Sequence, residues 1–473
     1  MKIRSHLAAL CCLAAAFAAA AGGLSPRDSV CADVLVVGAG SAGVPAAVQA
    51  GRLGARTVLV ESAAVLGGNL TLGGVEHPDP FRKNAQTVIG GIGLEWTMKT
   101  VALGRGAAAE ARAGRPLEPD RLTLKENFDP WTFVCVGEEL LRDAGVDLRY
   151  YETPVMAERL AGPDYNWRVL TGVQGGLREI RCRQLVDATG NGGLAGMCGA
   201  AFLPVDGEAQ GGSLHYRLTG VPDPKDLPEG LLARRLAEAH ASGALRDGDN
   251  HGGDVGDALI LRWQAANYVY GADNTTSESR TETNVRGRAS ALRVLRFVRT
   301  LPGGASARIA WMSPETGVRE TRRVKGRVVV TGDDYLSGRC WEDAVCYATY
   351  QIDMHAHRWK DFVRVPLGRD VYPTVPYRAL LPAGVEHLLV AGRCLSADRR
   401  AFAALRLCAP AMATGQAAGA AAALAARARI APSALDVEAL KRVLAEHGQI
   451  VPKPGLFEDA KRAACGARKE KWR

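Results

Sequence analysis

Two short apolar runs near the beginning of the chain flank a segment of small residues with helical spacing. Residues 34–37 and 57–60 are runs of valine and leucine with one threonine, and they predict two strands buried on both faces. Residues 44–53 lie between them and predict a helix, which Gly54 ends. A strand, a helix and a second strand in this order form the crossover unit of a parallel sheet. The pattern therefore predicts an α/β fold.

The pattern changes after this unit. Residues 75–130 are mixed and predict irregular structure, whereas residues 133–144 predict a helix and residues 146–151 predict a strand. Three short strands with turn residues between them follow, which is typical of a β-meander. They span residues 155–160, 167–172 and 177–182. A further strand follows at residues 185–190, and its last three residues read Ala-Thr-Gly.

The second half of the chain alternates between polar stretches and strongly patterned segments. Residues 282–299 predict a long helix, which Pro302-Gly303-Gly304 stops, and residues 327–331 predict a strand. The chain then enters a predicted strand at residues 387–391. A helix of alanine and glycine is predicted at residues 411–426.

The glycines of the first unit have the spacing G-x-G-x-x-G. Gly38 permits a tight turn, Gly40 lets the backbone approach a pyrophosphate, and Gly43 allows close packing of helix on strand. The beginning of the helix directs N–H groups and the positive end of its dipole toward the phosphates. Glu61 follows Gly43 by 18 positions, where an acidic residue binds a ribose hydroxyl. The unit predicts a dinucleotide site rather than an ordinary glycine-rich turn.

Three later segments extend this prediction toward a flavin. The pair Gly67-Gly68 is common where a chain passes under a flavin, and it favours a flavin over a nicotinamide cofactor, with a flexible loop as the alternative. A strand that ends in Ala-Thr-Gly after a meander is a second contact segment of flavoproteins with two dinucleotide folds. The small-residue helix at 411–426 suits close approach of its first amides to a flavin ring or a phosphate.

These segments resemble the bacterial FAD-dependent oxidoreductases with a glutathione-reductase-like FAD fold. That family is related to the flavin subunits of heterodisulfide reductases and, more distantly, to fumarate reductases. The matching segments cover most of residues 32–426; they are GAGSAG with Glu61, GGNLTLGG, DATGNGG at 187–193, VRETRRVKG at 318–326, QIDMH at 351–355, and the segment 375–419. The resemblance implies non-covalently bound FAD and an oxidoreductase, and it leaves the substrate open.

The resemblance also implies which residues contact the cofactor. These are Gly38, Gly40, Ser41, Ala42, Gly43, Glu61, Gly68, Asn69, Ala188, Thr189, Gly190, Gly392, Asp398, Gly415 and Gln416. By analogy with related flavoproteins, the backbone of Val155 would pair with adenine.

The motifs divide the chain into a cofactor-binding part and an insertion. We expect an FAD-binding domain with a Rossmann-like sheet and a β-meander, split between residues 32–200 and residues 381–430. Residues 201–380 interrupt it and predict an α+β cap or substrate domain. Residues 431–473 predict a short, basic, helical tail.

The first residues have the pattern of a secretory signal. Lys2 and Arg4 precede an apolar run at residues 7–20, and small residues follow. Residues 1–22 therefore predict a signal peptide and an exported, periplasmic or secreted bacterial protein without an integral membrane span after cleavage. The run is short for a bilayer span, and an uncleaved membrane-associated helix is the alternative.

The composition narrows the possible partners. The 473 residues are 47% hydrophobic and 23% charged, which excludes broad disorder. The net charge of +9 is not concentrated in a basic run interleaved with aromatic residues, so we expect no nucleic acid and at most an attraction to anionic substrates or lipid headgroups. The nine cysteines outside the leader have no metal-binding spacing, so no metal site is expected. Cys340 and Cys346 could form a bridge in an oxidising compartment.

Two polar residues of the insertion are the candidates for substrate-facing groups. His355 can shuttle the proton that accompanies hydride transfer, and Arg319 can clamp a carboxylate or polarise an oxygen. The alternatives are a core histidine held by Asp353 and an arginine paired with Glu320. Arg406, beside the returning small-residue helix, is the next candidate.

These observations predict an exported FAD-dependent enzyme that moves a hydride between a small organic substrate and flavin N5. The alternative is an electron-transfer subunit that works with a partner redox protein. The cysteines show no Fe–S pattern, which favours the enzyme. A non-catalytic binding protein that kept the fold is the third possibility, and the electron acceptor is left open.

Overall fold

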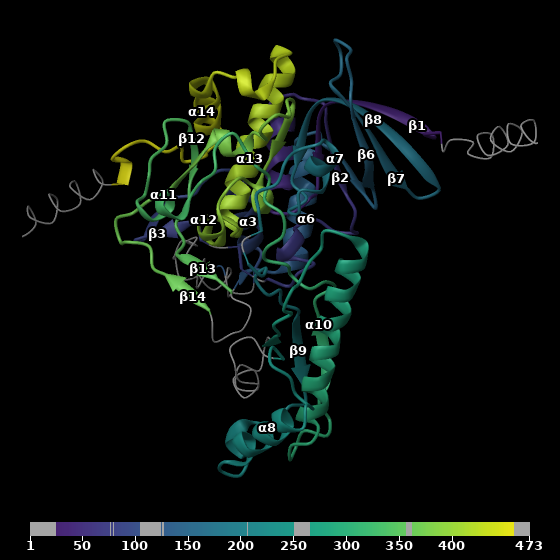
Figure 1. Ribbon diagram of the computed structural model, residues 1–473, viewed down its shortest axis with the longest axis vertical. Helices are drawn as coiled ribbons and strands as arrows, with labels where there is room; N and C mark the ends of the chain where they lie inside the picture. The colour runs from purple at the N-terminus through teal and green to yellow at the C-terminus, as the bar shows by residue number, and fades with distance from the viewer. Residues whose placement is uncertain are drawn as a thin grey trace, which may run out of the picture.

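The computed structural model describes residues 25–75, 77–78, 80–104, 124, 127–205, 207–249, 265–355 and 362–457, and a seven-stranded sheet lies at its centre (Figure 1). The sheet has the order β5-β2-β1-β8-β7-β6, and β16 also pairs with β8. Its strands are β1 (Asp28–Val37), β2 (Thr57–Glu61), β5 (Asp147–Tyr150), β6 (Thr153–Arg159), β7 (Trp167–Val173), β8 (Gly176–Asp187) and β16 (Leu388–Val390). The predicted signal segment lies outside the described residues.

Strand β8 joins a parallel part and an antiparallel part of this sheet. It runs parallel to β1 along most of its length, and β1 in turn runs parallel to β2. On its other side, β8 first pairs antiparallel with β7, and then residues 185–187 pair in parallel with β16. The sequence predicts separate strands at 177–182 and 185–190. They form one strand because the ladder to β1 continues through Gln184, which lies opposite Val34.

Two helices of small residues pack on this sheet in direct contact with each other. They are α2 (Gly43–Arg52) and α13 (Cys408–Ala428). A Cβ atom on Gly415 or on Gly419 would lie 2.0 Å from a carbonyl oxygen of the α2 segment, so only glycine allows this approach. Most residues of α13 are buried, which explains why alanine and glycine predominate in this helix.

The remaining elements cover this core. They are α3 (Ile92–Ala102), α6 (Pro130–Asp143), α7 (Gly193–Met197), α11 (Gly332–Leu336), α12 (Arg399–Leu405) and α14 (Val437–Glu446), and the strand pairs β3 (Arg82–Lys83) with β4 (Gln86–Thr87), β12 (Ala344–Tyr347) with β15 (Thr374–Pro376), and β13 (Ile352–Met354) with β14 (Val363–Val365).

Two of these regions differ from the sequence prediction. Helix α3 lies in the stretch predicted to be irregular, and tertiary contacts hold it: the ring of Trp96 stacks on Phe133 at 3.6 Å, and its indole N–H donates to the Phe133 carbonyl. Residues 327–331 form no regular strand. Their backbone instead makes single contacts with separate neighbours, such as Arg327 N to Leu381 O and an isolated bridge between Val330 and Ala397.

Residues 214–312 contain a smaller layered unit that extends away from the main sheet (Figure 1). It contains the three-stranded sheet β10-β9-β11, with β9 (His215–Thr219), β10 (Ala265–Ala266) and β11 (Arg308–Met312), and the helices α8 (Leu231–Ala241) and α10 (Ser277–Val298). These elements share their own hydrophobic cluster, which includes Leu214, Tyr216 and Val294. Val345 and Tyr377 belong instead to the main core. Residues of the stretch 201–380 therefore belong to more than one hydrophobic cluster.

Within the described part of the chain, no single helix has the length and apolarity to cross a bilayer. Only the bent pair α12 and α13 passes that test when taken together, and the two helices meet at 92°. Cys340 and Cys346 both carry free thiols, the first exposed and the second buried, so the bridge considered from the sequence is not formed.

Candidate functional site

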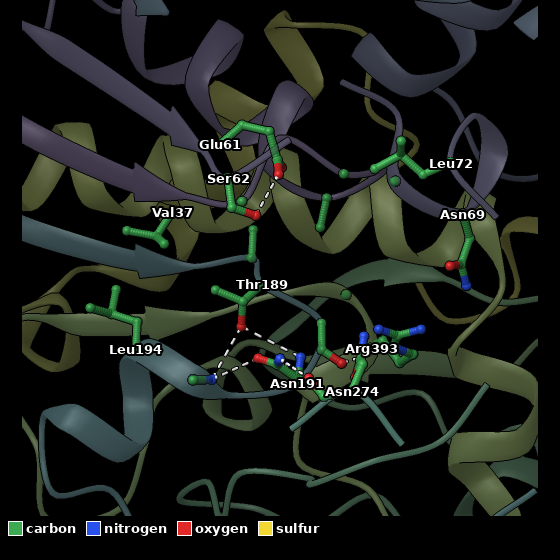
Figure 2. Close-up of a pocket in the computed structure, with 18 of the residues that line it drawn as sticks. Val37, Glu61, Ser62, Asn69, Leu72, Thr189, Asn191, Leu194, Asn274 and Arg393 are labelled. Atoms are coloured by element: carbon green, nitrogen blue, oxygen red, sulfur yellow. Dashed lines mark hydrogen bonds between the residues drawn. The ribbon is translucent and has the colours of Figure 1, made fainter. Parts of the chain in front are cut away.

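A cavity of about 600 Å³ lies at the carboxyl ends of β1, β2 and β8. Parallel strands place the turns that follow them at one edge of a sheet, which is where α/β proteins bind ligands. Figure 2 shows Glu61 on one side of the cavity and Arg393 with Asn274 on another. We call the region around Glu61 the acidic end, and the region lined by Arg393 and Arg406 the arginine end.

The three motif glycines have distinct surroundings. Gly38 has φ +95°, and a Cβ atom there would lie 2.7 Å from the carbonyl oxygen of Ala188. A Cβ atom on Gly43 would lie 1.7 Å from the carbonyl oxygen of Gly38, so this glycine is required by the packing of α2 on the turn. A Cβ atom on Gly40 would have the Cα of Gly68 as its nearest neighbour, at 3.9 Å. Gly40 therefore faces the open cavity, and the space that a Cβ atom would fill there is available to a ligand.

Two helices begin at the cavity wall, and neither has a side-chain cap. The Ncap of α2 is Ala42, which lines the cavity together with Ser41. The Ncap of α13 is Leu407, and Cys408 and Ala411 of its first turns line the cavity. The N–H groups at a helix N-terminus carry partial positive charge and bind anions. The α2 terminus, beside Gly40, is suited to a pyrophosphate.

The Glu61 carboxylate is fixed at the acidic end by its own loop. One oxygen accepts from the Ala39 N–H at 2.8 Å, and the other accepts from the Ala63 N–H at 2.9 Å and the Ser62 hydroxyl at 3.1 Å. A carboxylate has about four acceptor positions, so capacity is left for ligand hydroxyl groups. This geometry is suited to holding a ribose.

Asp187 holds the Ala-Thr-Gly segment against the cavity. It is fully buried at the end of β8, and it accepts from the Thr189 N–H at 2.9 Å, the Thr189 hydroxyl at 2.6 Å and the Ala195 N–H at 2.7 Å. Burial raises the pKa of this carboxyl group. Asp187 does not line the cavity; it fixes the backbone that does.

Arg393 and Arg406 form the arginine end. Arg393 donates from Nε to the Gly190 carbonyl at 2.8 Å and from Nη1 to the Val318 carbonyl. Arg406 follows α12, and its Nη2 donates to the Asp353 carbonyl at 3.1 Å and lies 3.9 Å from the Asp353 carboxylate. Its Nε is buried without a hydrogen-bond partner among the described residues. Burial lowers the pKa of both guanidinium groups, that of Arg393 to about 10.

His355 and Arg319, the two residues predicted to face the substrate, are absent from the cavity wall. His355 Nδ1 lies 2.7 Å from the Tyr268 hydroxyl, and Nε2 lies 3.2 Å from an Asp353 carboxylate oxygen. Burial, reinforced by the charge of Arg319, lowers the pKa of His355 to about 2. The imidazole is therefore neutral near pH 7 and does not fit the predicted proton shuttle. Arg319 donates to the Gly211 carbonyl, and its guanidinium lies 5.5 Å from the Tyr268 ring centre.

Most of the residues predicted to bind the cofactor lie together on the cavity wall. They are Gly38, Gly40, Ser41, Ala42, Glu61, Gly68, Asn69, Ala188, Thr189, Gly190 and Gly392, and Arg406 joins them. Gly43 lies behind the wall in the packing contact described above.

Four predicted residues lie elsewhere. Val155 is 52% exposed on β6, and the wall is formed instead by the residues just before it, 152–154. Asp398 caps α12 by accepting from the Ala401 N–H at 2.8 Å. Gly415 contacts α2, as described above. Gln416 accepts from the Ile92 N–H at 2.8 Å inside the core.

Several wall residues were not identified from the sequence. Arg393 lies within a motif segment, directly after Gly392, and could have been found there. A further group comes from the smaller unit and its border, namely Asn274, Thr275, Thr276, Ser277, Arg280, Glu315 and Thr316. These residues belong to no recognisable motif. Only the fold brings them to the wall, so the sequence pattern could not identify them.

The wall as a whole fits FAD. It offers a carboxylate for a ribose, an open glycine turn with an uncapped helix for a pyrophosphate, and Gly68-Asn69 with the α13 terminus further along. The same wall continues to residues of the smaller unit, such as Asn274 and Arg280.

A family match over most of the chain agrees with this geometry. The FAD-dependent oxidoreductase family matches residues 33–444. A thiamine thiazole synthase from Aeropyrum pernix is 30% identical over 258 residues, which are 50% of this chain and 83% of that protein. Among solved structures, a geranylgeranyl bacteriochlorophyll reductase-like protein from Thermoplasma acidophilum has a TM-score of 0.39 at 13% identity and covers 88% of this chain and 84% of its own. The p-nitrophenol 4-monooxygenase from Pseudomonas putida has a TM-score of 0.36 at 13% identity, with 89% and 84% covered.

Proposed function

This chain belongs to the FAD-dependent oxidoreductase family, and on that premise we propose that it moves a hydride between a small organic substrate and N5 of its FAD, outside the cytoplasm. Like the family to which it belongs, it is an oxidoreductase that uses FAD. The identity of the transferred species, the position of the substrate and the export of the chain are the proposed parts.

One observation carries the proposal. The cavity does not end at the groups suited to FAD but continues to Asn274, Thr275 and the Arg280–Glu315 ion pair of the smaller unit. An electron-transfer subunit has no need of a small-molecule site beside its flavin. A small-molecule oxidoreductase needs one, because the substrate must lie against the ring with water excluded.

When bound, FAD supplies the hydride chemistry at N5. The chain supplies position and electrostatics. Glu61 and the α2 terminus would hold the adenosine and pyrophosphate, and residues of the smaller unit line the same cavity. Arg406 presents a buried guanidinium to this space, and the Asp353 carbonyl holds one of its nitrogens. Because the Asp353 carboxylate is fixed by His355, His355 is a positioning residue for Arg406.

The proposal is tested by anaerobic half-reactions. The purified protein is reduced by light, or left oxidised, and is mixed with alcohols, 2-hydroxy acids, carbonyl compounds and enoates while the flavin absorbance is followed. We expect at least one class to change the redox state of the flavin faster than free FAD does. If every class leaves the flavin unchanged while a redox protein from the native host exchanges electrons with it, the electron-transfer alternative replaces this proposal.

Export rests on the amino-terminal pattern of Lys2, Arg4 and the apolar run that follows. We expect the mature chain to begin between Gly22 and Ser25. Amino-terminal sequencing of the protein from fractionated native cells measures this. An intact Met1 in the cytosolic fraction would refute export while leaving the enzymatic proposal untouched.

A further inference from the structure

Two arginines at the cavity wall have no carboxylate within hydrogen-bonding distance in the described part of the chain. Arg393 donates to two backbone carbonyls, those of Gly190 and Val318. The carboxylate nearest to Arg406 is that of Asp353, at 3.9 Å, and its closer oxygen is already bound by His355. The arginine end therefore carries an excess of positive charge among the described residues.

Apart from Glu61 at the acidic end, the other charged side chains on the same wall have an oppositely charged partner. Arg280 pairs with Glu315 within the wall itself. Glu152 pairs with Arg178 at 2.8 Å and accepts from the Thr171 hydroxyl at 2.6 Å. The excess of positive charge is thus confined to the arginine end of the cavity, where a ligand can supply the missing negative charge.

Arg406 also has an unused donor. Its side chain is 9% exposed, it lines the cavity, and its buried Nε has no hydrogen-bond partner in the described ranges. Burying a guanidinium without a close negative charge is unfavourable, so an anionic ligand at this wall would be stabilised. A guanidinium presents its donors in a plane that matches the two oxygens of a carboxylate.

The beginning of α13 adds to this field. Cys408 and Ala411 line the same cavity as Arg406, and the Ncap Leu407 provides no side-chain cap. In a helix of this length the N-terminal N–H groups favour an anion in front of them. The guanidinium groups and the helix terminus therefore favour the same kind of ligand.

We propose that the arginine end binds a carboxylate group of the substrate between Arg393 and Arg406. The proposal rests on the proposed function, and it narrows the substrate class to small organic acids. A carboxylate held there would fix the orientation of the substrate against the flavin, with the smaller unit as cover. The reduced flavin ring is a second possible source of negative charge at this place, so the test must separate the two.

The test uses the FAD-loaded, oxidised protein. Acetate and succinate are titrated while the visible flavin absorbance is recorded, and acetamide and succinamide serve as neutral controls of the same shape. The wild type should show saturable changes with the acids and none with the amides. Arg406→Gln should weaken succinate binding roughly ten- to a hundredfold, the loss expected for a hydrogen-bonded charge pair. Arg406→Lys should weaken it less, because it keeps the charge and loses only the planar fork.

Arg234→Gln is the matched control, because the Arg234 side chain is 66% exposed on α8 and far in sequence from the wall residues. It should bind succinate like the wild type. Every variant is first shown to bind FAD and to melt like the wild type. If Arg406→Gln fails this check, the succinate affinities of Arg406→Lys and Arg393→Lys are compared with that of the wild type instead. The two-electron reduction potential of each variant is measured in parallel.

The outcomes separate the possibilities. Absence of any change with the acids in the wild type, or equal succinate affinity in Arg406→Gln and wild type, would overturn the carboxylate site. A variant with a shifted potential and unchanged succinate affinity would assign the charge to the flavin instead. If carboxylates bind as expected but no organic substrate exchanges electrons with the flavin, the carboxylate site is supported and the proposed hydride transfer is contradicted.

Discussion

The Nδ1 atom of His355 lies 2.7 Å from the hydroxyl oxygen of Tyr268, while its Nε2 atom lies 3.2 Å from Asp353. A carboxylate can only accept, so the imidazole hydrogen lies on Nε2 and Nδ1 accepts the Tyr268 proton. The ring is thereby held as one neutral tautomer. Asp353 in turn binds Arg406 through its carbonyl. This series of hydrogen bonds, from Tyr268 through His355 and Asp353, holds the guanidinium of Arg406 at the cavity wall.

The neutral histidine predicts a pH dependence of stability. The pKa of His355 is lowered from 6.5 to about 2 in the folded protein, so below pH 6.5 the unfolded chain binds one proton more than the folded chain at this residue. The free energy of unfolding should therefore fall as the pH falls, by up to about 1.4 kcal/mol per pH unit from this residue. His355→Gln should remove that contribution. Urea unfolding of both proteins at pH 7.5, 6.5, 5.5 and 5 measures the difference.

The difference between the two proteins should be constant above pH 6.5 and should shrink below it, because only the wild type loses stability through His355. The lowered pKa of His215, about 4, affects both proteins equally and cancels in the comparison. Parallel curves down to pH 5 would show that the folded histidine titrates normally, and the tautomer described above would be wrong.

Tyr268→Phe tests the other partner of His355. The change removes the donor to a buried acceptor and should destabilise the fold by about 1–3 kcal/mol. Tyr151→Phe serves as the control, because Tyr151 is 67% exposed. Equal denaturation midpoints for Tyr268→Phe and the control would mean that the hydroxyl contributes nothing to holding the ring.

The cofactor-binding part of the fold could be predicted because the residues that each of its elements requires lie close together in the sequence. The turn that begins at Gly38 needs glycine for its positive φ, the buried strands need continuous apolar runs, and α13 needs small residues to touch α2. Each of these requirements leaves a pattern within a few residues. Helix α3 left none, since its stability comes from the contact of Trp96 with Phe133, which lies on another helix.

The catalytic half of the site could be predicted only in part. His355 and Arg319 were predicted because they lie in family-like segments, but such a segment does not indicate which of its side chains reach the cavity. The lining of the cavity answers that question, because it includes Arg406 and Arg393 and lacks His355 and Arg319. Asn274 and Thr275 could not have been identified, because the segment that carries them has no motif and reaches the wall only through the packing of the smaller unit.

Glu61→Gln tests the acidic end. The amide removes one acceptor oxygen and the negative charge, and we expect FAD affinity to fall by about 1.5–3 kcal/mol, or roughly ten- to a hundredfold. Isothermal titration of the apoprotein with FAD measures it, with Glu139→Gln as an exposed control. Unchanged FAD affinity would show that another group binds the ribose.

Gly43→Ala tests the packing of the turn. The new methyl group would lie 1.7 Å from the Gly38 carbonyl oxygen, so the backbone must move. Overpacking of this kind costs about 1–3 kcal/mol, and urea unfolding of the apoprotein should show this loss. An apoprotein as stable as the wild type would mean that α2 and the turn separate easily, contrary to the packing described.

The central claim is that FAD lies in this cavity with its pyrophosphate at Gly40, and Gly40→Ala tests it most directly. Its methyl group would have Gly68 Cα as nearest neighbour at 3.9 Å, so the apoprotein should unfold at the wild-type urea concentration. The same methyl group would project into the pyrophosphate position. Titration of both apoproteins with FAD should therefore show equimolar binding by the wild type and at least about tenfold weaker binding by the variant. Equal FAD affinity in the two proteins, or a wild type that binds no FAD, would contradict the account.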